Sequence, residues 1–469
     1  MKFGKSLVLL VDGVPTPNGG GTSQTLANLL SGWKNDIYYL GGDTESQGGF
    51  EQRMDVKMLQ YPKRKWERLS NRLGHWLNAW LLRRQLTHLQ QLVLSAIDLP
   101  LPEQCIVLLS TSLPEKLIIG RRLQQAGYTV LPYFMDDWMA GSTLRWRGGN
   151  LQQTVQQLLQ QAPAWLMISR QLHHTLLRRY QLAPKPCLVV HNPAPAVQLT
   201  DGSWQMASDV DDDNDAARKL QTANSILSKE ELPTANRQHL KEELPTNNLN
   251  QAAAALAASH QEPAVATEDE TPCQLPTANY QLIYAGSIWP MHADALAAVA
   301  RAVHRLQQQG HVGFQLQVYS SAAHWQQQQA ALAGPGVQYM GWLPYAQLQP
   351  LLQQAWLLVC TASFEEAHQA YSNSSVQTKL TDYMAAGRPI LFVGPDEAAS
   401  GQFVDEYDIG FSLATAHAAD IAERLLAISA LPVQYRRKCI NALREASTRF
   451  SQAAVQQRLY AFLEEVGKG

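Results

Sequence analysis

The feature that most constrains the fold is an alternation of short apolar runs with longer helical patterns, which occurs twice along the 469-residue chain. The first series predicts strands at residues 7–11, 37–41, 105–110, 129–135, 165–169 and 187–190, with helices such as 23–33, 114–125 and 151–161 between them. The second predicts strands at residues 281–286, 314–320, 356–360 and 389–394, with helices near 292–309, 345–354, 376–386 and 418–429. This order indicates an α/β protein with two doubly wound parallel sheets facing a cleft, where ligands bind outside the carboxyl ends of the strands.

The chain divides into four expected parts. Residues 1–194 hold the first series, residues 279–450 hold the second, and residues 451–469 are expected to form a C-terminal helix. Residues 195–278 differ in composition, because they contain an acidic run, an alanine-rich tract and the near-repeat KEELPTAN and KEELPTNN. This composition predicts a disordered insertion, which is either a tolerated repeat expansion or a docking segment for a partner.

The charge balance and the cysteines exclude several classes of protein. With a net charge of −2 and 17% charged residues, the chain has no global field that would attract nucleic acid. Its five cysteines contain no C-x-x-C pair, which argues against a disulfide framework or a structural zinc site and favours a reducing cytoplasm. The apolar run near the N-terminus is interrupted at Asp12, so neither a signal peptide nor a membrane span is predicted.

Three consecutive glycines, at positions 19–21, follow the first apolar run. They lack the Lys-Ser/Thr pair of a P-loop and the G-x-G-x-x-G spacing of a dinucleotide fingerprint. One interpretation is a strand-to-helix turn in which Thr22 or Ser23 caps the helix. The other is a backbone that approaches a ligand closely, which glycines allow.

The stretch SNSSVQTKLTDYMAAGRPILFVGP, residues 372–395, carries the most chemistry. Ser374, Ser375 and Thr378 are expected at the start of a helix, where hydroxyls and unpaired N–H groups suit a phosphate. Asp382 follows one turn later and suits a sugar diol. The next apolar run would place this helix at the ligand-binding edge of the second sheet.

This stretch resembles the nucleotide-sugar segment of retaining GT-B glycosyltransferases, which reads P-x-K-L-x-E-Y-L-A-A-G-x-P, where this chain has QTKLTDYMAAGRP from Gln377. QLIYAGSIWPMH from Gln281, the stretch ending HNPAP at Pro195, VLPYFMDDW from Val130 and the three glycines resemble further segments of that family. The resemblance implies two Rossmann-like domains. It also implies a donor site made by Gly20, Gly21, Gly286, Ser287, His292, Ser374, Ser375, Thr378, Lys379 and Asp382.

Some of these positions depart from the family pattern. Many relatives carry two glutamates in this segment, whereas this chain has Ser374 at the first place and Asp382 at the second. Ser287 and His292 stand where relatives carry basic residues that meet the diphosphate. We therefore expect helix N-termini, Lys379 and a protonated His292 to meet the diphosphate charge.

Asp136 and Asp137 follow an expected strand of the first sheet, and the resemblance makes them the candidate catalytic pair. They would orient an acceptor hydroxyl or bind a divalent cation; the alternative is a strand-end turn capped by Asp137. No second carboxylate cluster completes a metal site, so no metal is predicted.

Residues 61–86 combine basic side chains with Trp66, Trp76 and Trp80 at helical spacing. A basic amphipathic helix with tryptophans suits a membrane surface or a lipid-linked acceptor. The alternative is a helix of the first domain that uses its apolar stripe in the core.

Together, the resemblance implies a hexosyltransferase of polysaccharide biosynthesis, without a cofactor, which moves a sugar from a nucleoside diphosphate sugar to a glycan or lipid-linked acceptor with retention. We expect it in the cytoplasm or peripherally at the inner membrane face. A nucleotide-sugar epimerase of the same fold and a non-catalytic nucleotide-sugar-binding subunit are the alternatives.

Overall fold

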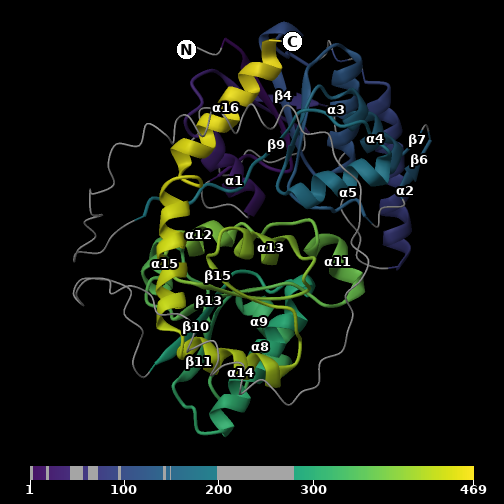
Figure 1. The fold of residues 1–469 in the computed structure, drawn as a ribbon. Coiled ribbons are helices and arrows are strands. Elements are labelled where there is room, and N and C mark those ends of the chain that lie inside the picture. The colour runs from purple at the N-terminus through teal and green to yellow at the C-terminus, as the bar shows by residue number, and fades with distance from the viewer. Residues whose placement is uncertain are drawn as a thin grey trace, which may run out of the picture. The chain divides into compact units, whose positions relative to one another are not determined.

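Two parallel sheets organise the described part of the chain, as predicted (Figure 1). The computed structural model describes residues 4–16, 21–42, 56–61, 72–92, 94, 97–140, 144–147, 149–197 and 279–468. Here the first half means the described residues up to 197, and the second half means residues 279–468. Both halves belong to one compact unit of the chain.

The first sheet has the strand order β3-β2-β1-β4-β5-β8-β9. Its strands are β1 (Ser6–Val11), β2 (Ile37–Gly42), β3 (Val56–Tyr61), β4 (Cys105–Ser110), β5 (Val130–Phe134), β8 (Trp165–Met167) and β9 (Cys187–Val189). Its helices are α1 (Gly21–Leu30), α2 (Arg72–Gln90), α3 (Pro114–Gln125), α4 (Leu151–Gln161) and α5 (Arg170–Tyr180), with a 3₁₀ turn at Pro102–Gln104. A short antiparallel pair, β6 (Arg145–Trp146) and β7 (Gly149–Asn150), lies outside the sheet.

The second sheet has the strand order β12-β11-β10-β13-β14-β15. Its strands are β10 (Tyr280–Ala285), β11 (Phe314–Tyr319), β12 (Val337–Gly341), β13 (Leu357–Thr361), β14 (Ile390–Val393) and β15 (Gly410–Leu413). Its helices are α8 (Pro290–Gln308), α9 (Ala322–Leu332), α10 (Tyr345–Leu352), α11 (Glu366–Ser372), α12 (Lys379–Ala385), α13 (Ala399–Glu406), α14 (Ala418–Ser429) and α15 (Pro432–Ser447).

The last helix, α16 (Gln452–Lys468), lies where a C-terminal helix is expected and packs against the first half. Its buried Leu459 and Leu463 join the apolar cluster that also contains Leu26 of α1. The hydroxyl of Tyr460 donates a hydrogen bond to the carbonyl of Leu29 (2.8 Å). Helix α16 therefore ties the C-terminal end of α1 to the rest of the unit (Figure 1).

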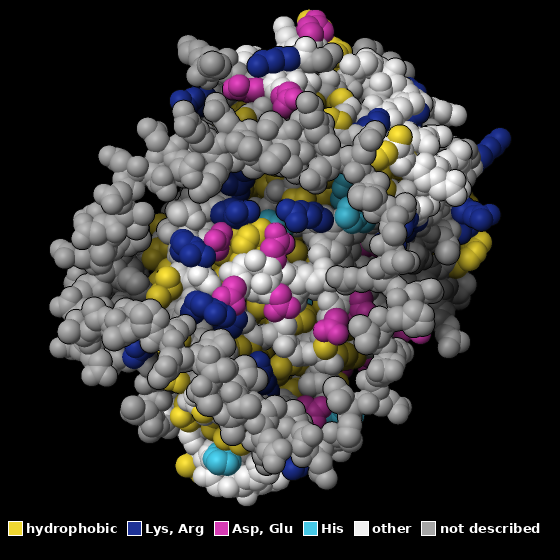
Figure 2. All heavy atoms as spheres, viewed as in Figure 1, with side chains coloured by type: hydrophobic (Ala, Val, Ile, Leu, Met, Phe, Trp, Pro, Cys, Tyr) yellow, Lys and Arg dark blue, Asp and Glu magenta, His cyan; other side chains and the backbone are white. Residues whose placement is uncertain are grey.

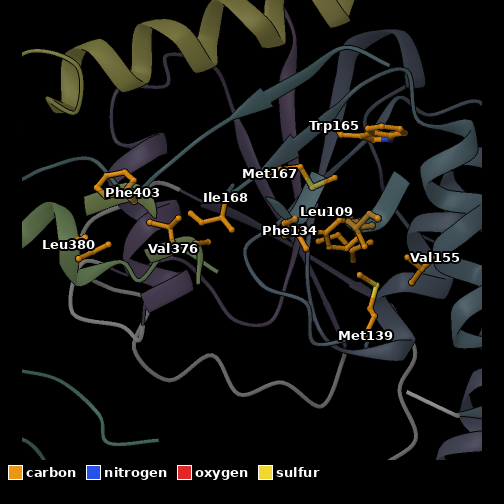
Figure 3. Packing of buried hydrophobic residues seen from close by; sticks show 14 of the residues in the cluster. Leu109, Phe134, Met139, Val155, Trp165, Met167, Ile168, Val376, Leu380 and Phe403 are labelled. Atoms are coloured by element: carbon orange, nitrogen blue, oxygen red, sulfur yellow. The ribbon is translucent and has the colours of Figure 1, made fainter. Parts of the chain in front are cut away.

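Buried side chains of both halves form one continuous apolar cluster (Figure 3). Leu109, Phe134 and Met167 belong to the first sheet, and the cluster continues through Ile168 to Val376 at the start of the second half's α12 region. Each buried side chain of this size stabilises the fold by about 2 kcal/mol relative to exposure to water. The site described below is thus built on two sheets that share a core.

The helix predicted at residues 376–386 begins later than expected. The structure has α11, an extended stretch, and then α12 starting at Lys379. The hydroxyl of Ser374 donates to the carbonyl of Ala370 (2.6 Å) and so satisfies the end of α11. Serine side chains that bond to nearby backbone compete with helix continuation, which explains the break.

Several sequence-based expectations fall outside the described residues: Gly20, residues 62–71 of the amphipathic segment, and nearly all of the insertion. Among the described cysteines, Cys105, Cys187 and Cys360 are free thiols, whereas Cys439 takes part in a disulfide. No helix in the described ranges is long and apolar enough to cross a bilayer.

Candidate functional site

A cavity of about 260 Å³ lies at the carboxyl ends of both sheets. The first half contributes Gly21, Thr22, Met135, Asp136 and Ile168; the second contributes Met291, His292, Ala362, Tyr371, Ser372, Ser375, Val376, Gln377, Thr378 and Ser400. Ligands of doubly wound sheets bind at this edge. Another cavity of about 270 Å³ is lined mainly by glutamines and arginines of α2, α3 and α4, and by no residue of either parallel sheet.

The two neighbouring aspartates have different environments. Asp137 is 1% exposed, and both of its carboxylate oxygens accept hydrogen bonds from Arg179 of α5, each at 2.5 Å. Asp136 lines the cavity, and its Oδ1 accepts a hydrogen bond from the N–H of Trp138 (3.3 Å). The expected catalytic pair is therefore divided: Asp137 is held in an ion pair away from the cavity, and Asp136 alone faces it.

Burial raises the pKa of Asp136 to about 6, and the nearby carboxylates of Asp137 and Asp12 add to this effect. Asp136 is thus mostly ionised at neutral pH and becomes protonated in mild acid. A carboxylate with this pKa suits the acceptance of a proton or a hydrogen bond from a hydroxyl.

Gly21 is the first residue of α1, and a Cβ placed on it would lie 3.2 Å from Oγ1 of Thr378. Ser23 does not cap the helix, because its Oγ accepts from the N–H of Thr16 (3.0 Å) and donates to the carbonyl of Val14 (3.3 Å). The glycine therefore lets the first half approach the residue that precedes α12.

The ammonium group of Lys379 is buried and has no hydrogen-bond partner among the described residues. It lies 4.0 Å from the centroid of the Tyr284 ring and 3.7 Å from the position that a Cβ on Gly286 would take. Gly286, in the loop that follows β10, has a φ of +129°, a conformation that other residues rarely adopt. Burial lowers the pKa of Lys379 to about 8, and no described residue pairs with this ammonium group to offset the cost of burying its charge.

His292 lines the cavity from the first turn of α8, and its Nδ1 lies 2.9 Å from the carbonyl oxygen of Thr361. Burial lowers the pKa of His292 to about 3, and the charge of Lys379 contributes. The imidazole is neutral at physiological pH, so the expectation of a protonated His292 is wrong for this structure. Because a carbonyl only accepts, Nδ1 carries the proton.

The serines of residues 374–375 connect the two halves. Ser374 is 1% exposed, does not line the cavity, and accepts at its carbonyl a hydrogen bond from the hydroxyl of Ser169. Ser375 lines the cavity, and its hydroxyl donates to the carbonyl of Met135 (3.3 Å). Ser374 is therefore directed away from the place where a donor contact was expected.

Asp382 is half-buried in α12 and does not line the cavity, although Thr378, four residues earlier, does. Burial raises the pKa of Asp382 to about 7, an effect that the nearby hydroxyl of Tyr345 partly offsets. Ser287 is exposed in the loop after β10, and its carbonyl accepts a hydrogen bond from Tyr284 (2.8 Å). The cavity thus gathers five of the predicted residues: Gly21, Asp136, His292, Ser375 and Thr378.

Gln377 and Tyr371 are among the polar residues of the cavity that sequence reasoning missed. Gln377 donates from Nε2 to the carbonyl of Thr361 (2.8 Å), and its N–H donates to the hydroxyl of Ser400 (3.1 Å). Burial raises the pKa of the Tyr371 phenol, and the nearby charge of Asp136 adds to this effect. Gln377 stands at the proline position of the quoted motif, a departure that could have drawn attention to it. Among the described residues, no three His, Cys, Asp or Glu side chains gather as a metal-binding group.

Residues 279–430 match a protein-family model described as Glycosyl transferases group 1. This part of the chain is similar to the group 1 glycosyltransferases. It spans β10 to α14 and includes Gly286, His292, Lys379 and Asp382 of the candidate site. No protein of curated function matches the chain in sequence.

Solved structures show that the whole described chain has the GT-B fold of glycosyltransferases. HepE of Anabaena, in complex with UDP-glucose, aligns with a TM-score of 0.56 at 11% identity, covering 98% of this chain and 99% of that one. A glycosyltransferase from Rickettsia africae aligns with a TM-score of 0.57 at 10% identity, covering 98% of each chain. Sucrose-phosphate synthase of Thermosynechococcus elongatus aligns with a TM-score of 0.55 at 13% identity, covering 98% of this chain and 99% of that one. At these identities the likeness concerns the fold alone.

Proposed function

We propose that this protein is a hexosyltransferase that moves a sugar from a nucleoside diphosphate sugar to a hydroxyl of a glycan or lipid-linked acceptor, with retention at the anomeric carbon. The GT-B fold and the group 1 glycosyltransferase domain support a transferase. HepE, which has this fold, was solved with UDP-glucose, so UDP-glucose is the first donor to test.

The observation that carries the proposal is the ammonium group of Lys379. It is buried, lacks a partner among the described residues and lies beside Gly286 at the carboxyl end of β10. A buried cation is costly unless an anion pairs with it. A diphosphate that lies on the backbone of the Gly286–Ser287 loop would supply this anion, and Lys379 would stabilise the charge that develops when the bond from diphosphate oxygen to sugar C1 breaks.

The cavity offers a place for the transferred sugar and the acceptor hydroxyl. We assign Asp136 the role of orienting that hydroxyl and accepting its proton as the new bond from the acceptor oxygen to C1 forms. The neutral side chains of His292, Gln377 and Thr378 line the same cavity and would hydrogen-bond to the sugar hydroxyls. Gly21 would keep the backbone of α1 close to Thr378 and to the bound donor.

Asp382 is assigned to the ribose, beside the hydroxyl of Tyr345. Its raised pKa comes from burial, which the hydroxyl of Tyr345 offsets only in part. Two ribose hydroxyls would donate to it and favour its ionised form, as hydrogen bonds to a carboxylate do.

Turnover of UDP-glucose labelled in the sugar, with and without an acceptor, tests this function against the two alternatives. A transferase moves the label to the acceptor and releases UDP. An epimerase converts the donor without an acceptor, and a binding subunit binds UDP without turnover. The anomeric proton coupling of the purified product measures retention, and a product of inverted configuration would contradict that part of the proposal.

A further inference from the structure

We propose that one surface of the first half docks on the anionic face of a lipid bilayer. This surface, the Trp–Arg face, consists of Trp76, Trp80, Arg83 and Arg84 of α2 with Arg145 of β6 and Arg147, which directly follows β6. The proposal concerns attachment to a surface and does not depend on the transferase activity.

Helix α2 divides its side chains between two faces. Gln85, Leu86 and Leu89 are buried, and the two leucines belong to the apolar core. Trp76 is 69% exposed and Trp80 is 43% exposed. Residues spaced by three or four positions share one side of a helix, so the tryptophans lie in line with Arg83 and Arg84, which are also exposed. The core is therefore supplied by the leucines, and the tryptophans are left in contact with water.

The β6–β7 pair extends this face. The hydroxyl of Thr87, one turn beyond Arg83, lies 3.4 Å from the backbone carbonyl of Arg147 and donates a hydrogen bond to it. Arg145 and Arg147 are both exposed. Figure 2 shows basic and hydrophobic side chains projecting together at the right edge of the molecule, where Figure 1 places α2, β6 and β7.

The charge of this region differs from that of the chain as a whole. The net charge of the protein is −2, yet α2 contains no aspartate or glutamate, and none occurs between Trp138 and Thr200. Arg84 lies 5.4 Å from the centroid of the Trp80 ring, so cationic and aromatic groups alternate on the surface. The Trp–Arg face is therefore locally cationic.

A bilayer with anionic lipids complements this combination better than a second copy of the face. Indole rings favour the boundary between headgroups and acyl chains, where an apolar body and a polar N–H are both satisfied. Two copies of the face would bring like charges together, which opposes dimerisation through it. Anionic headgroups attract each nearby arginine with an energy that raises affinity about fivefold per residue.

The test is sedimentation of the full chain with vesicles of phosphatidylcholine, with and without phosphatidylglycerol, at low and high salt. We expect binding to the anionic vesicles that weakens with salt. The double variant Arg83→Gln/Arg84→Gln should lose about twenty-five-fold in affinity, because two attractions of about fivefold each are removed. Trp76→Ser/Trp80→Ser should also weaken binding and reduce the quenching of tryptophan fluorescence by brominated lipids.

A matched control lies on the second half, where Trp342 is as exposed as Trp76, at 69%, and Arg301 and Arg305 are exposed on α8. The triple variant Trp342→Ser/Arg301→Gln/Arg305→Gln should bind anionic vesicles as the unchanged protein does. Near-ultraviolet circular dichroism and the thermal midpoint verify folding of every variant.

Three results would overturn the proposal: no binding by the unchanged protein, equal and salt-independent binding to neutral vesicles, or an equal loss in the control and in the Trp–Arg variants. A dimer in sedimentation velocity that dissociates in Trp76→Ser/Trp80→Ser would assign the face to a second copy instead. No sugar nucleotide enters the assay, so its outcome is separate from that of the proposed activity.

Discussion

Replacing Lys379 with methionine should stabilise the protein and weaken its binding of nucleoside diphosphates. The pKa of Lys379 is about 8 in the folded protein in place of the ordinary 10.5, because the ammonium group is buried. Charging this side chain therefore costs about 3 kcal/mol more in the folded than in the unfolded state. Methionine has a similar length and no charge, so Lys379→Met should raise the free energy of unfolding at neutral pH by up to about 3 kcal/mol.

The sign of the pH dependence follows from the lowered pKa. Below pH 8 the side chain is charged in both states and the full penalty is present. Between pH 8 and 10.5 the folded protein has lost the proton that the unfolded chain still holds, so the penalty disappears as pH rises. Urea titrations at several pH values should therefore show the gain from Lys379→Met shrinking over this interval.

Ligand binding provides the sharper measurement. If a diphosphate pairs with Lys379, binding restores the proton, so the unchanged protein should take up about half a proton on binding UDP at pH 8 and about nine tenths at pH 9. Calorimetry in two buffers of different ionisation enthalpy measures this uptake. Lys379→Met should abolish it and weaken binding. The reasoning fails if the unchanged protein binds UDP without proton uptake, or if the variant takes up protons and binds equally well.

Three further predictions concern other residues of the site. In calorimetric titrations, Asp382→Ala should weaken UDP binding by about ten- to a hundredfold, and Asp382→Asn by less. The loss of affinity should be smaller for 2′-deoxy-UDP, which lacks one of the two ribose hydroxyls. Gly21→Val should reduce turnover far more than the thermal midpoint, because a branched side chain would meet Thr378; unchanged turnover would show that Gly21 serves only in a turn. Asp136→Asn should remove activity yet raise the free energy of unfolding at pH 7 by about 1 to 3 kcal/mol. The pKa of Asp136 is raised from 3.8 to about 6, so the cost of ionising it grows between these pH values and is complete above pH 6. The kcat/KM of the unchanged protein should fall below about pH 6, where Asp136 becomes protonated.

The strands that the sequence predicts best are those covered on both faces. β4 matches its predicted bounds, and all six of its residues are buried, which gives the continuous apolar run expected of a central parallel strand. α3 and α4 also match, because proline starts the first and Asn150 caps the second. β3, β12 and β15 were missed. All three are edge strands of the two sheets, and β12 has no fully buried residue.

The motif of residues 372–395 led to the correct region but not to every contact. The sequence offers no reason to prefer Asp136 or Asp137 as the residue that faces the site. The two are distinguished by the ion pair that Asp137 makes in the folded protein. That partner, Arg179, lies on α5, 42 residues later, and no local pattern pairs the two. Likewise, the low pKa of His292 depends on its burial beside Thr361 and on the charge of Lys379, which the fold brings together from distant positions.

Hydrogen bonds with the first half hold α12 and the segment that precedes it, in addition to the contacts within the second half. Ser169 donates to the carbonyl of Ser374, Ser375 donates to the carbonyl of Met135, and Asn192 donates to the hydroxyl of Thr381 (3.3 Å). Ser374, which stands at the position of the first glutamate in the resembled motif, thus has a structural role. Its hydroxyl also donates a hydrogen bond to the carbonyl of Ala370 in α11.

In the proposed function, recognition of the donor sugar would therefore fall to neutral groups of the cavity. A hydrogen bond between neutral groups contributes about 0.5 to 1.5 kcal/mol, compared with about 1.5 to 3 kcal/mol when one group is charged. A hydrogen bond from a sugar hydroxyl to Gln377 or Thr378 would therefore contribute less binding free energy than one to a carboxylate at position 374. The proposed diphosphate contact at Lys379 would then supply a larger part of the donor affinity. The charge of that one side chain is therefore the most informative quantity to measure in this site.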